Sequence, residues 1–235
     1  MTQRPQTQER QPKQTNWSRA IRVWALLLLA LTVGSLIGWA ALPSADEAPP
    51  PVVPTDPAAI ERIAWPKEVA PGRPWHYIVI HHSATTAGTL EAIDADQRGR
   101  GFTNGVGYHF LINNGRSAGT ADGQILPTAR WINQLDGAHT RVATHPEFNT
   151  EGIGICLIGN FDLQQPSAAQ MASLEMLVLA LRNRYQIPLD SIFGHGELKN
   201  THCPGRLFPM ETFLMTLRQN RLQHLKSNSS AADPE

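Results

Sequence analysis

An uncharged apolar run near the N-terminus is the feature that most constrains this 235-residue chain. No side chain from Val23 to Leu42 is charged, and a run of about twenty apolar residues matches the thickness of the hydrocarbon core of a bilayer. Because the run has no polar face, a helix buried in a protein core is the weaker explanation. The sequence therefore predicts a single transmembrane helix over residues 19–42, which acts as a signal-anchor.

The charges on either side of this run predict the orientation of the chain. Five basic residues precede it, whereas the first charges after it are the acidic Asp46 and Glu47. Basic flanks stay on the cytoplasmic side, so residues 1–18 are expected to be a disordered cytoplasmic segment. Everything after the run is expected on the periplasmic side of the cell membrane. Gly38-Trp39-Ala40 also resembles a signal-peptidase site, so secretion after cleavage is the alternative.

Composition divides the rest of the chain into a linker, one domain and a tail. Residues 43–59 contain six prolines and are predicted to form a semi-extended linker. Residues 60–225 have a globular composition and are numerous enough for one domain with its own core. Residues 226–235 are expected to be a flexible tail. Since 20 acidic and 20 basic residues balance, the net charge does not indicate a nucleic-acid partner.

Strands and helices alternate within the predicted domain. Apolar patterns predict strands at 75–81, 107–113, 153–158 and 192–193, and the third should be central because it is apolar on both faces. Helices are predicted at 89–98, after residue 167 and over 209–225. Ser167 and Gln170 form a capping box before the second of these helices. The fold class is therefore α/β, with a central mixed β-sheet flanked by helices.

Three residues have side chains that suit a metal site: His81, His195 and Cys203. His81 ends a predicted strand, and the other two flank a short loop after the last strand, where α/β sheets present functional groups. Two imidazoles and one thiolate would form a three-ligand zinc site with an open fourth position, and sulfur favours zinc over magnesium or calcium. The spacing is also compatible with a hydrogen-bonded strand histidine, and with a Cys203 that is buried or bridged to Cys156.

Five sequence blocks occur in an order that carries a family resemblance. They are Val79–Thr85, Val106–Ile112, Gly137–Thr140, Gly152–Phe161, and Gly194-His195 with Cys203–Gly205. Together they resemble the N-acetylmuramoyl-L-alanine amidase family, which includes phage amidase-type lysozymes and animal peptidoglycan recognition proteins. The resemblance spans roughly residues 75–217, which is nearly the whole predicted domain.

The resemblance implies roles for individual residues. His81, His195 and Cys203 fall on the zinc ligands. Tyr108 falls on the catalytic tyrosine, and Thr201 on a position where some members have a lysine and the recognition proteins have a threonine. His139 falls on a substrate-groove position. Arg130 and Trp131 just before that block are predicted to line the same groove, with ordinary surface and core positions as the alternative. Cys156 stands where the cytosolic recycling amidases have a glutamate base, so the identity of the proton-transfer group stays open.

The activity implied by the resemblance is zinc-dependent hydrolysis of the amide bond between N-acetylmuramic acid and L-alanine in peptidoglycan. A phenol with a pKa of about 10 is a poor base, so Tyr108 is expected to polarise and orient rather than to abstract a proton. The alternative is a non-catalytic peptidoglycan-binding module tethered to the membrane. The presence of both Cys203 and Tyr108 favours the enzyme.

Overall fold

The structure is a computed structural model that describes residues 49–70 and 72–230, with side chains described as far as Asn220. The predicted cytoplasmic segment 1–18 and the predicted membrane helix 19–42 lie outside these residues. Among the described residues, no helix combines the length and the apolar character needed to cross a bilayer.

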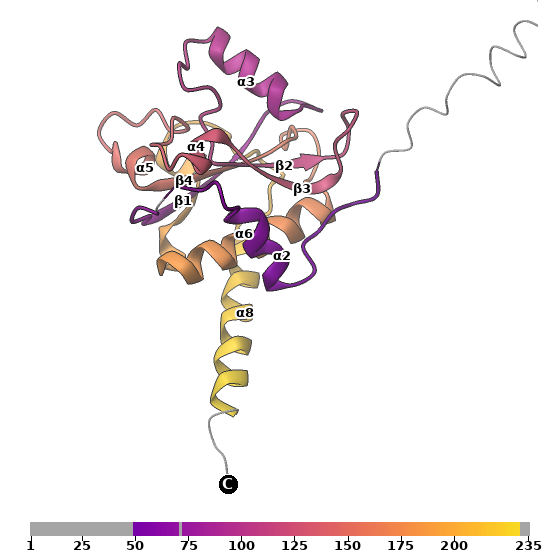
Figure 1. The fold of residues 1–235 in the computed structure, drawn as a ribbon, viewed down its shortest axis with the longest axis vertical. Coiled ribbons are helices and arrows are strands. Elements are labelled where there is room, and N and C mark those ends of the chain that lie inside the picture. Colours follow the sequence, from indigo (N-terminus) through magenta and orange to yellow (C-terminus); the bar gives the residue numbers. More distant parts are fainter. Residues whose placement is uncertain (1–48, 71, 231–235) are drawn as a thin grey trace, which may run out of the picture. The chain divides into compact units, whose positions relative to one another are not determined.

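A five-stranded mixed sheet forms the centre of the domain (Figure 1). Its strand order is β3-β2-β4-β1-β5, in which β1, β2, β4 and β5 are parallel and β3 runs antiparallel to β2. The strands are β1 Tyr77–His82, β2 Phe110–Asn114, β3 Asp122–Pro127, β4 Gly152–Leu157 and β5 Ile192–Gly194. The middle strand β4 is buried along its whole length, so the predicted central strand and the predicted mixed sheet are confirmed.

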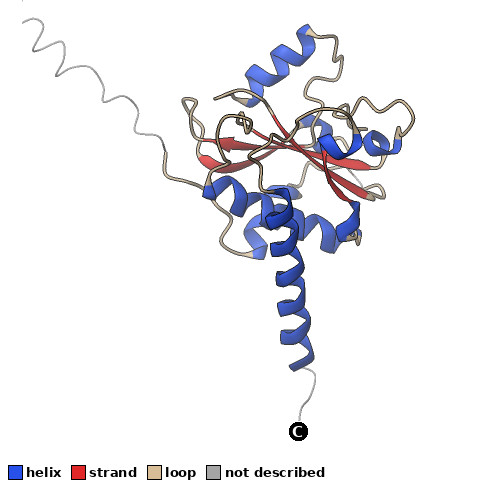
Figure 2. Ribbon diagram, turned by 180° about the vertical axis from the view of Figure 1, so that it is seen from behind, coloured by secondary structure: helices blue, strands red, loops and turns tan. Residues whose placement is uncertain are grey.

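Helices lie on both sides of this sheet (Figure 2). They are α2 Pro57–Ala64, α3 Leu90–Gly99, α4 Ala129–Ile132, α5 Glu147–Thr150, α6 Ala168–Tyr185, α7 His195–Leu198 and α8 Met210–Ser230, with a 3-10 turn at Leu189–Ser191. The capping box at the start of α6 is formed as predicted, because the Ser167 hydroxyl accepts from the Gln170 amide and the Gln170 side chain accepts from the Ser167 amide.

Regular secondary structure is present on both sides of the predicted domain limits. Helix α2 begins inside the predicted linker, where Asp56 caps it by accepting from the Ala59 amide at 2.7 Å. The amide of Val52 donates to the carbonyl of Asp122 at the start of β3 at 2.7 Å. At the other end, α8 continues to Ser230, past the predicted limit at Leu225. Short proline-spaced segments can thus belong to the fold when their free backbone groups find partners.

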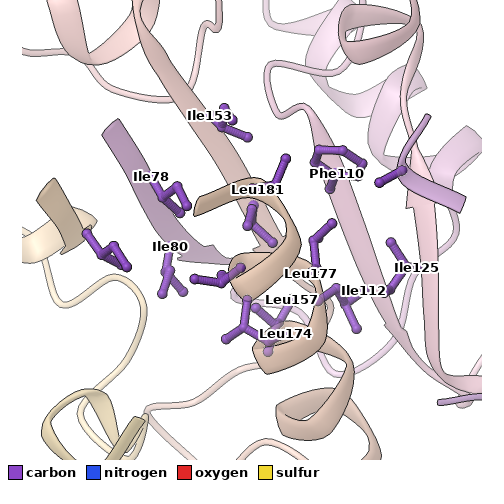
Figure 3. Close-up of a cluster of buried hydrophobic side chains, with 14 of the residues drawn as sticks. Ile78, Ile80, Phe110, Ile112, Ile125, Ile153, Leu157, Leu174, Leu177 and Leu181 are labelled. Carbon is purple, nitrogen blue, oxygen red and sulfur yellow. The ribbon is translucent and has the colours of Figure 1, made fainter. Parts of the chain in front are cut away.

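Helix α6 covers one face of the sheet and forms the main core with it (Figure 3). Leu174, Leu177 and Leu181 of α6 are fully buried. They face side chains from three parallel strands, namely Ile78 and Ile80 of β1, Phe110 and Ile112 of β2, and Ile153 and Leu157 of β4. Burial of each such aliphatic side chain contributes about 1.5–3 kcal/mol, so this face holds most of the apolar stabilisation.

The opposite face of the sheet has a smaller apolar cluster and carries polar side chains. Because side chains alternate along a strand, His81 points away from α6 when Ile78 and Ile80 point toward it. His81 is in register with Cys156 of β4, which belongs to the second cluster together with Val106 and Leu111. This face, away from α6, is where the candidate site is built.

Candidate metal centre

The structure brings the three predicted metal ligands together. One ligand atom each from His81, His195 and Cys203 lies within 4.8 Å of the others. The distance from Sγ of Cys203 to Nδ1 of His81 is 3.6 Å, and the ring centroids of His81 and His195 are 4.6 Å apart. Since β1 and β5 are parallel neighbours, their carboxyl ends meet at one edge and deliver His81 and His195 to the same place.

A tight loop after β5 carries the other two ligands. His195 is the first residue of α7, and the Glu197 carboxylate accepts from the Gly194 amide at 2.7 Å. The Gly196 amide donates to the carbonyl of Cys203 at 2.6 Å. A Cβ on Gly196 would lie 2.7 Å from the carbonyl oxygen of Thr201, so only glycine permits this close approach. The loop therefore folds Cys203 back toward His195.

The polar atoms of this cluster fit a bound cation. Nε2 of His195 is buried and has no hydrogen-bond partner among the described residues, which is unusual for a buried polar atom. Burial lowers the pKa of His195 to about 4, with Lys199 adding to the shift, and burial also lowers the pKa of His81. Both imidazoles are therefore neutral near pH 7 and offer lone pairs.

The Cys203 sulfur completes the set of donors. Burial raises the pKa of its thiol to about 12, although the His82 amide, which donates to Sγ at 3.4 Å, acts in the opposite direction. A nearby cation would be needed to form the thiolate near neutral pH. Both cysteines are free thiols in the described part of the chain, so the alternative in which Cys203 is bridged to Cys156 is wrong.

Tyr108 lies beside the cluster, two residues before β2. Its ring centroid is 5.1 Å from that of His81, and its hydroxyl lies near the thiol of Cys156. Burial raises the pKa of Tyr108 well above its usual value, and the nearby Cys156 and Cys203 add to the shift. The phenol therefore keeps its proton and can act as a hydrogen-bond donor.

Thr201 belongs to the loop that carries Cys203. Its hydroxyl accepts from the Cys203 amide at 3.3 Å, and the residue is partly exposed. The side chain therefore helps to shape the turn that places the sulfur. Its predicted part in catalysis stays a prediction.

His139 lies directly behind His81 rather than at the surface. His139 is 7% exposed. Nδ1 is 3.2 Å from Nε2 of His81, and Nε2 is 3.2 Å from the carbonyl oxygen of Gly152. Both ring nitrogens therefore have partners within the protein, and the predicted part of His139 in substrate binding stays a prediction.

Arg130 and Trp131 are both buried, and Arg130 also lines a cavity with Leu90, Val106 and Thr128; their predicted part in substrate binding stays a prediction. Trp131 is fully buried in the main core, and its indole nitrogen donates to the carbonyl of Ala64. Arg130 is 5% exposed and donates to the backbone carbonyls of Val106 and Asp136. Both therefore hold the fold together. Helix α4 spans only four residues, too few for a periodic pattern that would reveal which side is buried.

Asn149 is a supporting residue to which the sequence assigned no role. Its side-chain oxygen accepts from the amides of His139 and Thr140, each at 3.0 Å, and its side-chain nitrogen donates to the Thr140 carbonyl at 2.8 Å. Asn149 lies outside the five sequence blocks, and three hydrogen bonds to one loop leave no local sequence pattern. Only the structure reveals these three hydrogen bonds of Asn149.

Fold and site together define an α/β domain with a buried cluster of two histidines and one cysteine at one edge of a mixed sheet. The chain belongs to the N-acetylmuramoyl-L-alanine amidase family, because the sequence profile of that family matches residues 71–206, more than half of the 235 residues. The predicted resemblance is thereby confirmed.

Individual relatives include both amidases and recognition proteins. A peptidoglycan-recognition protein of Drosophila simulans is 32% identical over 142 residues, which are 57% of this chain and 70% of that protein. An N-acetylmuramoyl-L-alanine amidase of Sus scrofa is 31% identical over 102 residues, 43% of this chain and 15% of the relative. The solved structure of N-acetylmuramoyl-L-alanine amidase LysC from Clostridium intestinale URNW has a TM-score of 0.53 and 31% identity, and the match covers 62% of this chain and 86% of that one.

Proposed function

We propose that this protein is a zinc-dependent hydrolase that cuts the amide bond between N-acetylmuramic acid and L-alanine in peptidoglycan. The observation that carries the proposal is the buried cluster of His81, His195 and Cys203, in which Nε2 of His195 has no hydrogen-bond partner among the described residues. Leaving such an atom buried and unpaired costs free energy, and a cation bound between the two imidazoles and the sulfur would remove that cost.

The donor set supports zinc in particular. Two neutral imidazoles and one sulfur suit zinc and leave a fourth position free, as in catalytic zinc sites. A zinc ion held there would lower the pKa of a bound water toward about 7 and polarise a substrate carbonyl. Cys203 is then a ligand, because its sulfur faces Nδ1 of His81 at 3.6 Å, and we do not assign it the role of nucleophile.

Tyr108 is the side chain best placed to assist the reaction. The oxygen of an amide carbonyl gains negative charge when the carbonyl carbon is attacked, and a fixed hydrogen-bond donor stabilises that charge. The Tyr108 hydroxyl keeps its proton because burial raises its pKa, and its ring lies beside His81. The Thr201 hydroxyl, in the loop of Cys203, is a second candidate donor at the same edge of the sheet.

The substrate is inferred from the names of the relatives. Both the Sus scrofa relative and LysC are named as N-acetylmuramoyl-L-alanine amidases, and the Drosophila simulans relative is named as a peptidoglycan-recognition protein. These names agree on the polymer and differ on whether it is cut. The second candidate function is therefore a peptidoglycan-binding module without activity. The three ligand residues favour the enzyme, since binding a polymer does not require this cluster.

Incubation with purified peptidoglycan tests the proposal. The full-length chain is prepared with its metal, stripped by a chelator, and stripped and then refilled with zinc or with magnesium. We expect free stem peptides, identified by mass, from the native and zinc-refilled samples alone. Release of stem peptides by the stripped protein at the native rate would refute the zinc mechanism. Retention of the polymer without any cleavage by the zinc-refilled protein would support the binding module instead.

A further inference from the structure

His81 is not an isolated ligand but the middle of a chain of contacts that runs back into the sheet. Its Nδ1 lies 3.6 Å from Sγ of Cys203, on the side of the metal cluster. Its Nε2 lies 3.2 Å from Nδ1 of His139. Nε2 of His139 in turn lies 3.2 Å from the carbonyl oxygen of Gly152, the first residue of β4.

We infer that His139 is a positioning residue, which fixes the ring and the tautomer of His81 so that Nδ1 of His81 presents its lone pair to the metal. This inference rests on the zinc site proposed above and adds to it a role for a second imidazole. The sequence predicted a different role for His139, in the substrate groove.

The positions of the ring protons follow from the order of the contacts. The carbonyl of Gly152 can only accept a hydrogen bond, so Nε2 of His139 carries a proton. A buried imidazole without a paired anion is neutral, so Nδ1 of His139 has no proton and accepts from Nε2 of His81. A neutral His81 protonated at Nε2 keeps its lone pair on Nδ1, the atom that faces Cys203.

The fold builds a dedicated seat for the His139 ring. A Cβ on Gly137 or on Gly154 would overlap the imidazole of His139, so two glycines leave the space that the ring fills. The backbone of His139 is held at the same time, since its amide donates to Asn149 at 3.0 Å. A side chain that binds substrate has to be accessible. The His139 side chain is instead enclosed on both sides, and the residue is only 7% exposed.

A second imidazole that is hydrogen-bonded to a metal-binding histidine changes the metal affinity of the site. A hydrogen bond to the distal nitrogen fixes the orientation of a metal-bound histidine and increases its basicity, and loss of such a partner typically lowers metal affinity about 10–100-fold. Loss of a residue that only fills space would lower stability and leave metal affinity unchanged. These two effects can be measured separately.

The test compares His139→Phe, His139→Asn and the control His109→Phe in the full-length chain. Phe fills the seat but cannot accept a hydrogen bond, whereas the side-chain oxygen of Asn can take the place of Nδ1. His109 is a fully buried histidine that bonds to backbone groups of Gly154 and Leu135. Its ring lies 5.8 Å from that of His139, and a phenyl ring at position 109 keeps that packing while it removes an imidazole that has no hydrogen bond to His81. Zinc affinity is measured by competition with a chelator, and thermal unfolding is recorded for each variant.

We expect zinc affinity to fall about 10–100-fold in His139→Phe, to recover most of the way in His139→Asn, and to stay at the native value in His109→Phe. The cobalt-substituted His139→Phe variant should also have altered visible bands, because the bands report the ligand field. Native affinity and native cobalt bands in His139→Phe would overturn the inference and leave the proposed function standing. A native protein that binds no zinc would instead overturn the proposed function itself.

A direct readout of the protons does not depend on the variants folding. Long-range proton–nitrogen NMR of the histidine-labelled protein distinguishes the two neutral tautomers and the imidazolium. We expect His81 and His139 both to carry their proton on Nε2. A proton on Nδ1 of His139 would reverse the direction of the hydrogen bond to His81 and overturn the inference.

Discussion

The two cysteines of the chain lie on the same face of the sheet but have different neighbours. Cys156 is fully buried in β4 beside Tyr108, whereas Cys203 faces Nδ1 of His81 across 3.6 Å. Cys156 therefore packs beside the site, whereas Cys203 is a candidate metal ligand. Side-chain type alone does not separate these roles; the neighbours of each sulfur do.

Replacement of each cysteine separates the two roles. Cys203→Ser should abolish zinc binding at equimolar metal, and activity with it, because a hydroxyl is a much poorer zinc ligand than a thiolate. Cys156→Ala is the matched control and should keep its zinc. Zinc content is measured by elemental analysis after gel filtration. Equal zinc in both variants would remove Cys203 from the ligand set.

Replacement of Tyr108 should change the rate without loss of the metal, unlike replacement of Cys203. Tyr108→Phe removes the hydroxyl but keeps the ring beside His81. Loss of one donor to a developing oxyanion lowers kcat by about 10²–10³, so a drop of this size with unchanged zinc content is expected. The kinetics are measured as release of stem peptide over time. A rate within threefold of the native one would show that the hydroxyl takes no part.

At the scale of elements, one face of the sheet forms the apolar core and the other face carries the candidate metal site. The face under α6 holds the main apolar core (Figure 3), while the other face carries His81, Cys156 and Tyr108 around the cluster. Alternation along β1 connects the two, because Ile80 points to the core and the next residue points to the site. A change in the α6 core should therefore alter stability with little effect on the metal cluster.

Leu177 tests this separation. It is fully buried at the centre of α6, so Leu177→Ala should lower the free energy of unfolding by about 2–5 kcal/mol. The folded variant should bind zinc with native affinity, since Leu177 is on the far side of the sheet. Urea unfolding and zinc competition on the same sample provide both values. A parallel loss of zinc affinity would indicate that the two faces are coupled.

His109 connects elements rather than groups in the site. Nδ1 accepts from the Gly154 amide of β4 at 2.9 Å, and Nε2 donates to the carbonyl of Leu135 at 3.0 Å. Burial lowers its pKa to about 3, whereas the unfolded chain has a histidine pKa near 6.5. Between these values the unfolded state binds more protons than the folded state, so stability rises with pH.

Acid unfolding checks this assignment. As pH falls from about 6.5 to about 3, the native protein should lose stability by up to about 1.4 kcal/mol per pH unit through His109 alone. His109→Asn keeps an acceptor for the Gly154 amide and has no titrating ring, so its curve should be shallower by about that slope. Urea unfolding of both proteins with chelator present, from pH 4 to pH 7, gives the comparison. Parallel curves would contradict the buried neutral state of His109.

Across the whole molecule, periodic patterns predicted the framework, and contacts between distant segments went unpredicted. The buried β4 and the capped α6 carry repeating apolar signals over many residues, so both were found. The antiparallel β3, Asp122–Pro127, was missed because its sequence has large apolar residues only at Ile125 and Leu126 and therefore shows no apolar–polar alternation. The ligand set came from ordered sequence blocks. The His81–His139 contact joins residues 58 apart and leaves no trace in local spacing, which explains why the sequence did not predict it.

The proposed location also belongs to the whole molecule. The run from Val23 to Leu42 lies outside the described residues, and the prediction that it anchors the chain depends on its length, its lack of charge and its basic flank. A peptidoglycan amidase needs its active domain on the outer side of the cell membrane, where the polymer lies. The predicted anchor and the proposed activity therefore predict the same topology, with the N-terminus inside and the domain outside the cell membrane.

Reporter fusions and membrane extraction test that topology in a Gram-negative host. Alkaline phosphatase fused after Glu235 should be active, because it requires export, whereas a green fluorescent protein fused at the same place should stay dark. The full-length chain should remain with the membranes after alkaline carbonate and leave with detergent. Replacement of the basic residues before the run, such as Arg19 and Arg22, by glutamate should reduce export, because these charges hold the N-terminus inside. A shortened, freely soluble product would instead identify the run as a cleaved signal peptide and contradict the anchor.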